Sequence, residues 1–348
     1  MNENWRILLA LGLTMVVLVG WNLLFPPEQT VQTEKRSETE VRQQPQAPAP
    51  QPENGRQAET GVQPAQQQQG PGQGELPASE FQDQTGRRVT VDTPLYKAVV
   101  NSQGGILEHF LLKKYDETIK QDSRPVDLVS PESRAKAPMG ILLNLKPTWS
   151  QGQWSLEGKD LHLQGMERGE LTLRGNLNGL ILERRLIFEA DTYQITEELS
   201  VINKTQGLTS GFLGQTMASQ GLVENENRYN RTNMIYYQEE IGLEREDDTD
   251  DLSVGLQPAK PVKWAGIDSN YFLMALVPTS GDAFLKGVFK QGIYRVSLET
   301  NLNLQPGQRQ DLSAIYFLGP KKKSLLAPIP KDLEESIYYG YLNIVAKP

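Results

Sequence analysis

Residues 7–25, ILLALGLTMVVLVGWNLLF, contain no charged side chain, and this run constrains the chain more than any other feature. At 1.5 Å per residue, a helix of this length just spans a hydrocarbon core of about 30 Å. Trp5 and Trp21 lie near its ends, where amphipathic rings prefer the membrane interface. A cleaved signal peptide would have a shorter apolar region followed by small residues, whereas NLLFPP ends this run. The sequence therefore predicts an uncleaved transmembrane anchor over residues 1–27.

The predicted anchor has apolar residues along the span and aromatic residues at its borders. The residues assigned to it are Trp5, Ile7, Leu8, Leu9, Val16, Val17, Leu18, Trp21 and Phe25. Arg6 and the terminal amine precede the span, against one acid, Glu3. The positive-inside rule then favours a cytoplasmic N-terminus and an exported remainder.

Residues 28–84 have the composition of a linker. Gln, Pro and Gly dominate in stretches such as RQQPQAPAPQPENG, and no aromatic residue occurs between Phe25 and Phe81. Such a segment cannot bury enough apolar surface to offset the entropy lost on ordering. We predict a disordered tether, which lets the domain that follows lie at a range of distances from the anchor.

Residues 85–330 have the patterns of short strands. Val89 and Val91 alternate with polar residues, and YQITEELSV places apolar residues on one face with Glu197 as the exception. The apolar members of that face are Tyr193, Ile195, Leu199 and Val201. Gly-Asn and Asn-Gly pairs in ELTLRGNLNGLILERRLIF are turn signals between strands. Many short strands with little helical periodicity predict a mainly β domain, a sandwich or a barrel.

The last residues, 331–348, have helical spacing. Acids precede a row of apolar side chains at Leu333, Ile337, Tyr341, Ile344 and Val345, although Gly340 weakens the pattern. Two placements stay open for this short amphipathic helix: the membrane surface, or the face of the β domain. An apolar ending is unusual for a globular domain, so the protein either ends at Pro348 or was cut there from a longer chain.

Composition argues against several kinds of chemistry. Lys and Arg number 35 against 43 Asp and Glu, a net charge of −8 that disfavours nucleic acid as a partner. There is no Cys, and the only histidines are His109 and His162, which we expect to be ordinary strand residues. His109 is beside Glu108, but adjacent strand residues face opposite sides. The sequence predicts no catalytic, cofactor or metal site.

Three motifs have plain structural interpretations. The acidic run 246–251 lacks the ligand spacing of an EF-hand, so we expect a solvated loop. NSQGG matches no phosphate-binding loop, and Gly104 and Gly105 are expected in a sharp turn with positive φ. Residues 263–278, KWAGIDSNYFLMALVP, are expected to form a buried core strand anchored by a Trp, with a binding-groove aromatic as the alternative.

In their order along the chain, these features resemble YidC-type membrane protein insertases of Gram-negative bacteria. An anchor and a Gln/Pro-rich tether precede VTVDTPLYKAVVNSQGGILEHFLLKKY, VKWAGIDSNYFLMALVP, IYFLGPKK and LEESIYYGYLNIVAKP, each of which is similar to a family segment. The residues that carry the resemblance are Gly104, Gly105, Trp264, Gly266, Tyr271, Phe272, Pro278, Gly319, Pro320, Tyr339 and Gly340.

The resemblance implies a large galactose-mutarotase-like β-sandwich in the periplasm, over residues 85–330, and attachment to the bacterial inner membrane. It implies a non-enzymatic role in inserting and folding inner-membrane proteins, with membrane lipid, nascent inner-membrane proteins, and the Sec translocon and its accessory subunits as partners. In the family this activity depends on later spans that this sequence does not contain. A stand-alone anchored sandwich that binds or scaffolds a partner is the alternative, and a sugar-active enzyme is the least favoured.

Overall fold

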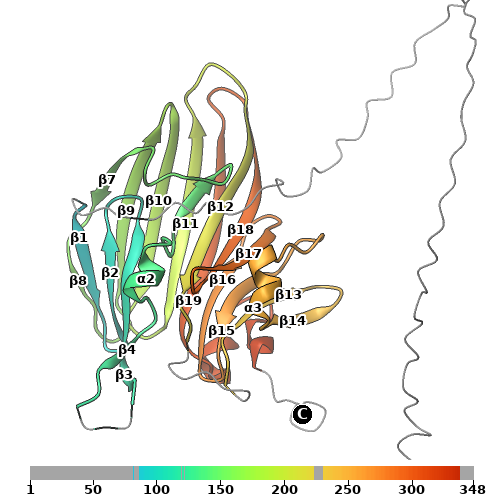
Figure 1. The fold of residues 1–348 in the computed structure, drawn as a ribbon. Helices are drawn as coiled ribbons and strands as arrows, with labels where there is room; N and C mark the ends of the chain where they lie inside the picture. The colour runs from blue at the N-terminus through green and yellow to red at the C-terminus, as the bar shows by residue number, and fades with distance from the viewer. Residues whose placement is uncertain (1–80, 82–85, 119, 121, 223–229, 338–348) are drawn as a thin grey trace, which may run out of the picture. The chain divides into compact units, whose positions relative to one another are not determined.

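A computed structural model of the protein describes residue 81 and residues 86–337, except 119, 121 and 223–229 (Figure 1). The predicted anchor, nearly all of the predicted tether and residues 338–348 therefore lie outside the described residues. The chain divides after Ala65, and the unit from Gln66 to Pro348 contains every described residue. None of the described helices is long and apolar enough to cross a membrane.

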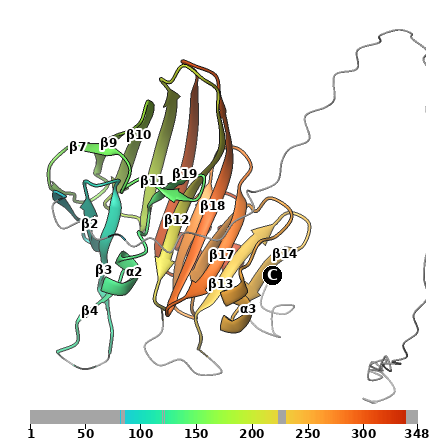
Figure 2. The same ribbon diagram turned by 45° about the horizontal axis from the view of Figure 1, so that its top comes forward.

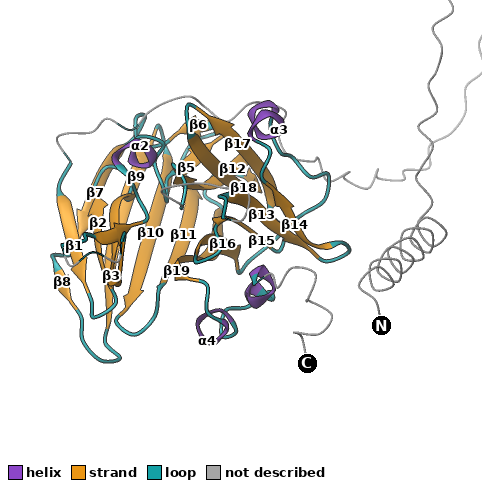
Figure 3. Ribbon diagram, turned by 60° about the horizontal axis from the view of Figure 1, so that its bottom comes forward, coloured by secondary structure: helices purple, strands orange, loops and turns teal. Residues whose placement is uncertain are grey.

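The described residues form three sheets rich in antiparallel pairs, so the prediction of a mainly β domain is confirmed (Figure 3). The first sheet has the order β4-β3-β2-β1-β8, and only the β1–β8 pair is parallel. Its strands are β1 (Arg88–Asp92), β2 (Tyr96–Asn101), β3 (Ile106–Asp116), β4 (Pro125–Asp127) and β8 (Leu161–His162).

The second sheet is the largest, with the order β14-β13-β15-β16-β19-β11-β10-β9-β7. Strand β19 joins its two halves, because it pairs with β16 on one side and β11 on the other. The strands are β7 (Gln153–Glu157), β9 (Arg168–Leu177), β10 (Leu180–Glu189), β11 (Gln194–Asn203), β13 (Asn233–Gln238), β14 (Gly242–Glu246), β15 (Trp264–Asp268), β16 (Phe272–Pro278) and β19 (Arg309–Pro320).

The third sheet has the order β17-β18-β12-β5-β6, and Figure 2 shows β12, β18 and β17 running side by side. Its strands are β5 (Ile141–Leu143), β6 (Lys146–Pro147), β12 (Thr209–Ser219), β17 (Phe284–Lys290) and β18 (Ile293–Leu304). One buried apolar cluster joins all three sheets through residues such as Phe110, Leu186 and Val296. The large sheet thus packs against both smaller sheets.

The strand faces follow the alternation in the sequence. Val89 and Val91 are buried, as is the predicted face of β11 with its exception Glu197. Of the two turn signals, only Asn178-Gly179 forms the β9–β10 turn, with φ of +52° and +94°. Gly175-Asn176 lies inside β9, because the strand pairing continues past it to Leu177.

The described residues include four short helical segments, two between strands and two after the last strand, β19. They are α2 (Pro131–Arg134), α3 (Thr249–Val254), α4 (Lys323–Leu326) and the 3-10 turn η1 (Leu333–Ser336). The acidic run was expected to be a loop, and this is wrong, because its second half forms the start of α3. Asp248 accepts hydrogen bonds from the backbone N–H groups of Asp250 and Asp251, and so caps this helix.

The described part of the predicted C-terminal helix, residues 331–337, is not α-helical. Lys331 and Asp332 have left-handed φ of +63° and +61°, so a helix cannot begin there. Leu333 is fully buried in the main core, and Ile337 packs against that core. In this part the chain lies on the β domain, and the remaining positions of the predicted apolar face lie outside the described residues.

Candidate functional site

A cleft of about 1310 Å³ opens where the ends of several strands meet. It is lined by the end of β3 and the loop after it, the end of β12, the β15–β16 turn and the residues after β19. Lys114, Arg124 and Lys322 contribute exposed cations to it, and Asp116 and Glu117 contribute exposed acids. The cleft therefore offers charges of both signs around its opening.

Aromatic side chains form one wall of the cleft. The rings of Tyr115 and Phe272 meet edge to face, with centroids 5.7 Å apart. Lys322 Nζ lies 5.3 Å from the centre of the Tyr115 ring, within the range of a cation–π contact. Phe289 and Tyr294, whose centroids are 4.6 Å apart, also line the cleft. Aromatic faces beside flexible cations suit an extended peptide or another amphipathic group.

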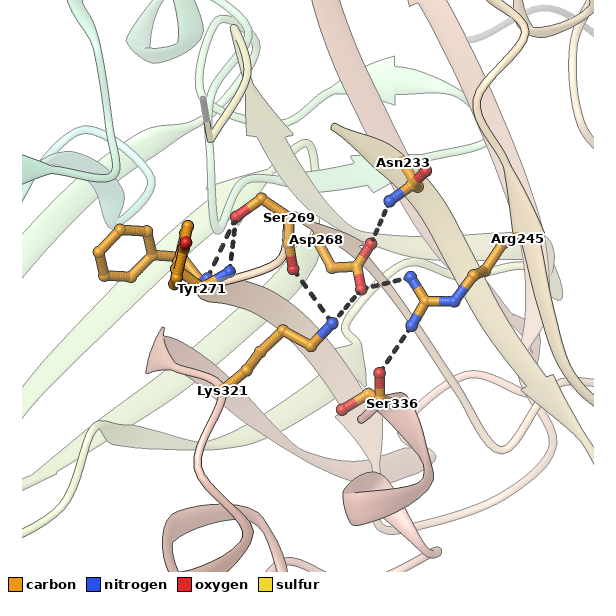
Figure 4. A network of polar contacts seen from close by, with 8 residues as sticks. Asn233, Arg245, Asp268, Ser269, Tyr271, Lys321 and Ser336 are labelled. Atoms are coloured by element: carbon orange, nitrogen blue, oxygen red, sulfur yellow. Dashed lines mark hydrogen bonds and ion pairs between the residues drawn. The ribbon is translucent and has the colours of Figure 1, made fainter. Parts of the chain in front are cut away.

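A buried ion cluster centred on Asp268 lies beside the cleft (Figure 4). The Asp268 carboxylate is fully buried and accepts hydrogen bonds from Asn233 Nδ2 at 2.8 Å, Arg245 Nη1 at 2.7 Å and Lys321 Nζ at 2.6 Å. Burial lowers the pKa of the Lys321 ammonium, while Asp268 acts in the opposite direction. The cluster keeps Asp268 and Lys321 almost entirely out of water and Arg245 mostly so, and a protein tolerates buried charges only when each is paired.

The cluster also fixes the last described turn of the chain. Arg245 Nη2 donates to the carbonyl oxygen of Ser336 at 2.7 Å, so η1 is tied to β14 and through Asp268 to β15 (Figure 4). Lys321 Nζ donates to the carbonyl oxygen of Ser269 at 3.1 Å, which ties the end of β19 to the β15–β16 turn. The cleft and the segment at Ser336 are thus held by one set of side chains.

The stretch expected as one buried strand is a hairpin of β15 and β16. Trp264 is buried and stacks on Tyr237 with centroids 5.8 Å apart, and the buried Pro278 ends β16. Tyr271 is 68% exposed, so the inclusion of this ring in the core is wrong. It lies in the turn, where Ser269 Oγ accepts hydrogen bonds from the backbone N–H groups of Tyr271 and Phe272.

Replacing Gly266 with Ala should destabilise the hairpin. A Cβ at this position would lie 2.3 Å from the carbonyl oxygen of Met274 and 3.0 Å from Ala275 Cα, both backbone atoms of β16. We expect a loss of about 1–3 kcal/mol in the free energy of unfolding, measured by denaturant titration. The control is Gly207→Ala, where a Cβ would meet nothing within 4 Å. Equal stability of the two variants would contradict the close approach of the backbones.

A second buried ion pair holds the glycine turn. Gly104 and Gly105 have φ of +77° and +73°, as the turn interpretation requires. Arg184, on β10, donates to the carbonyl oxygens of Gly104 and Met139 and lies 2.5 Å from Glu197 on β11. A Cβ at Gly105 would meet Arg184 Nη1 at 2.9 Å. Gly105 therefore leaves the space through which the guanidinium reaches the turn.

The residues that carry the family resemblance do not gather at one place. Tyr271, Phe272 and Pro320 line the cleft. Gly319 permits the close approach of Tyr193, whose ring carbon Cγ would lie 2.7 Å from an added Cβ. Gly104 and Gly105 lie in the β2–β3 turn, and Trp264, Gly266 and Pro278 lie elsewhere in the sheets. Tyr339, Gly340 and the anchor residues lie outside the described part.

The histidines have separate environments. His109 Nδ1 lies 2.7 Å from Asp127 Oδ2, and His162 is 73% exposed and 3.8 Å from Asp92. Glu108 is buried and pairs with the exposed Arg88, whereas His109 pairs with Asp127, so the two adjacent residues have different partners, as the strand geometry predicts. Among the described residues no group of three or more His, Cys, Asp or Glu could hold a metal ion.

No motif in the sequence marks the members of the Asp268 cluster. One signal was available, because Asp268 is the only charged residue in WAGIDSNYFLMALVP. An acid in such a run needs a cationic partner when it is buried. The partners Arg245 and Lys321 are distant in sequence, and only the sheet order brings them to it.

The fold and the site define a class of protein: a mainly β domain with a mixed-charge aromatic cleft and a buried ion cluster beside its C-terminal segment, which suits docking. The chain belongs to the family described as the YidC periplasmic domain, whose family model matches residues 88–348. "Membrane protein insertase YidC" from Maridesulfovibrio salexigens is 40% identical over 355 residues, covering 99% of this chain. The protein of the same name from Oleidesulfovibrio alaskensis is 38% identical, also over 99% of this chain.

The chain spans 62% of the length of these two relatives. Among solved structures, a galactose mutarotase-like protein from Lactobacillus casei covers 67% of this chain and 100% of its own, with 11% identity and a TM-score of 0.45.

Proposed function

We propose that this chain is the periplasmic portion of a membrane protein insertase, which assists the insertion and folding of inner-membrane proteins, alone or with the Sec translocon. The observation that carries the proposal is the match to relatives named as insertases, at 40% identity over 99% of this chain. A match over so much of the chain includes the apolar run and the tether as well as the β domain. The proposed activity is that of a whole insertase, of which this chain is proposed to be one portion.

The proposal includes the placement of the chain. Residues 1–27 are the inner-membrane anchor with a cytoplasmic N-terminus, residues 28–84 the linker, residues 85–330 the periplasmic sandwich, and residues 331–348 the approach to a second span. The uncharged run and the charge balance around Arg6 support the first assignment. The sandwich is proposed to be of the galactose-mutarotase type, which the three-sheet arrangement allows.

Within an insertase the β domain is proposed to space and dock partners. The cleft has aromatic faces and cations suited to emerging loops of client proteins or to Sec accessory subunits. The Asp268 cluster fixes the segment at Ser336, which precedes the proposed second span. The position of the cleft relative to that segment is therefore set by buried ionic contacts.

Insertion of inner-membrane proteins should fail when the whole protein is depleted and return when it is restored. Restoration with a version that lacks residues 85–326 should recover most insertion, because the domain spaces and docks partners while the spans do the insertion. The measurement is the protease protection of a newly made inner-membrane protein. Normal insertion after depletion would contradict the insertase assignment, and complete loss with the deletion would contradict the spacing role.

A stand-alone anchored binding or scaffold protein is the second candidate, and the cleft of about 1310 Å³ is the observation that favours it. Calorimetric titration of the purified chain with saccharides separates these candidates. Tight saccharide binding with normal insertion after depletion would support the binding protein over the insertase.

A further inference from the structure

Two turns that are distant in sequence lie at one end of the large sheet, as the strand register shows. Phe272 pairs with Pro320, so the β15–β16 turn is at the end where β19 leaves the sheet. Across β11 and β10, the same register places Arg168, the first residue of β9, at this end too. The β8–β9 turn therefore shares it. We call it the exit end (residues 164–167, 269–271 and 320–323).

Both turns at the exit end carry a large apolar side chain in water. Met166 is 85% exposed in a tight turn, in which the Glu167 backbone N–H donates to the carbonyl oxygen of Gln164 at 3.0 Å. Tyr271 is 68% exposed, and its carbonyl oxygen accepts a hydrogen bond from the Lys321 backbone N–H at 2.8 Å. An ordered backbone thus presents each side chain to solvent, where neither gains the stabilisation that burial gives.

Two exposed lysines follow the residue that binds the Tyr271 carbonyl. They are Lys322 and Lys323, and Lys322 Nζ lies 5.3 Å from the centre of the Tyr115 ring. Aromatic rings with a polar tip, beside lysines, are typical of a membrane interface. The ring lies at the level of the headgroups, and the long side chain of lysine lets the ammonium reach the phosphates.

The spacing of the two exposed side chains favours a lipid surface over a protein partner. Four strand spacings separate β9 from β16 in the sheet, which is about 19 Å at about 4.8 Å each. A protein interface has a contiguous apolar core. A membrane is a broad, even surface and can contact both turns at once.

The last described residues of the chain also lie at the exit end. Arg245 donates to the carbonyl oxygen of Ser336 and to the carboxylate of Asp268, the last residue of β15 (Figure 4). In the proposed placement, residues 331–348 lead from here to a second membrane span. The two exposed side chains are thus on the side of the domain from which that span follows.

We propose that the exit end lies on the membrane surface, with Met166 and Tyr271 at the level of the lipid headgroups. This inference rests on the proposed placement of the chain at the inner membrane. The exposed acids Asp116 and Glu117 lie in the same region, at the cleft, and offset the charge of the lysines. The apolar side chains, and not a net charge, therefore hold the domain to lipid.

This orientation deepens the proposed docking role. Tyr271, Phe272 and Lys322 line the cleft, so this part of its rim lies at the lipid surface. A client segment that leaves the membrane beside the domain then meets the aromatic wall of the cleft first. The opposite end of the sheet stays in water, because the ten residues of β11 span about 30 Å.

Single-cysteine fluorescence tests the contact with lipid, because the chain has no Cys of its own. Met166→Cys and Tyr271→Cys each carry an environment-sensitive nitrobenzoxadiazole dye. The matched control is Leu208→Cys, because Leu208 is 55% exposed and lies in the β11–β12 turn at the opposite end of β11. The whole chain is placed in vesicles of phosphatidylethanolamine and phosphatidylglycerol, a fraction of which carry a nitroxide on the headgroup.

The nitroxide should quench the dye at both exit-end positions at least about twofold more strongly than at Leu208→Cys. Equal, weak quenching at all three positions would overturn the proposal. A dye whose emission shifts to the blue without quenching at the exit end would also overturn it, because a second copy of the chain would then be the cover.

Removal of the two apolar side chains tests whether they make the contact. With the dye on Ser324→Cys, an exposed position in α4, Met166→Ser together with Tyr271→Ser should lower quenching to the level of the Leu208→Cys control. Leu208→Ser together with Ile241→Ser replaces two exposed apolar side chains elsewhere and should leave quenching unchanged. Full quenching of Ser324→Cys without Met166 and Tyr271 would overturn their role.

Depletion of the whole protein separates this inference from the insertase assignment. Strong quenching at the exit end with normal insertion after depletion would contradict the insertase assignment and support the lipid contact. Failed insertion after depletion with no quenching at the exit end would support the insertase assignment and overturn the lipid contact.

Discussion

Glu197→Ala should lower the free energy of unfolding by about 3–5 kcal/mol, since it leaves a buried guanidinium without its counter-ion. Arg184 and Glu197 are both fully buried, with Nε and Oε1 2.5 Å apart. Glu197 Oε2 also accepts hydrogen bonds from Gln215 Nε2 at 2.6 Å and from the Tyr316 hydroxyl at 3.1 Å. The substitution therefore leaves three buried donors short of an acceptor.

Urea titration of the purified whole chain measures the effect. The control is Glu198→Ala, the next residue along β11, whose partner Arg185 is 46% exposed, so that water screens the pair and its loss should change stability little. Arg184→Met combined with Glu197→Leu should recover much of the loss, because the buried charges are removed together. A loss for Glu197→Ala no larger than for Glu198→Ala would show that the buried pair does not hold the glycine turn.

Asp268→Asn is expected to have the second largest effect, about 3–5 kcal/mol, because two buried cations lose their shared anion. Lys321 is 6% exposed and Arg245 23% exposed, so water can compensate only in part. Because Asn has nearly the same size as Asp, the change in the free energy of unfolding reports the loss of the negative charge. Loosening should extend to η1, because Arg245 holds the Ser336 carbonyl.

Hydrogen exchange of the amides of residues 333–336 measures that loosening directly. Exchange there should accelerate in Asp268→Asn and stay unchanged in Asp247→Asn, whose exposed pair with Arg231 contributes less than about 1 kcal/mol. If the stability falls while exchange in η1 stays slow, the cluster stabilises the β domain without fixing the exit segment.

The β character of residues 85–330 was predictable from the sequence. Apolar and polar residues alternate along a strand because successive side chains point to opposite faces of the sheet, whichever strands are its neighbours. The same holds for the glycine turn: Gly104 and Gly105 both need positive φ, and few other residues adopt it. The predicted C-terminal helix is wrong over residues 331–337, the part of it that the structure describes. Its apolar spacing matched a helix, but Lys331 and Asp332 adopt left-handed φ, and burial of Leu333 in the core accompanies a 3-10 turn.

The acidic run shows the same limit. A count of Asp and Glu over residues 246–251 predicted a solvated loop, whereas Asp248 caps a short helix against β17. Capping depends on which backbone N–H groups lie within reach of the carboxylate, and the composition of the run does not contain that information.

The sequence by itself determined two features that the structure describes: the strand-rich body and the turn that requires Gly104 and Gly105. These properties depend on neighbours within a few residues. Only the tertiary structure decided which charges are buried together, because Arg184 meets Glu197 and Asp268 meets Lys321 through strand order. A buried charge is tolerated only beside its partner, and partners separated by tens of residues meet only when the sheets are assembled.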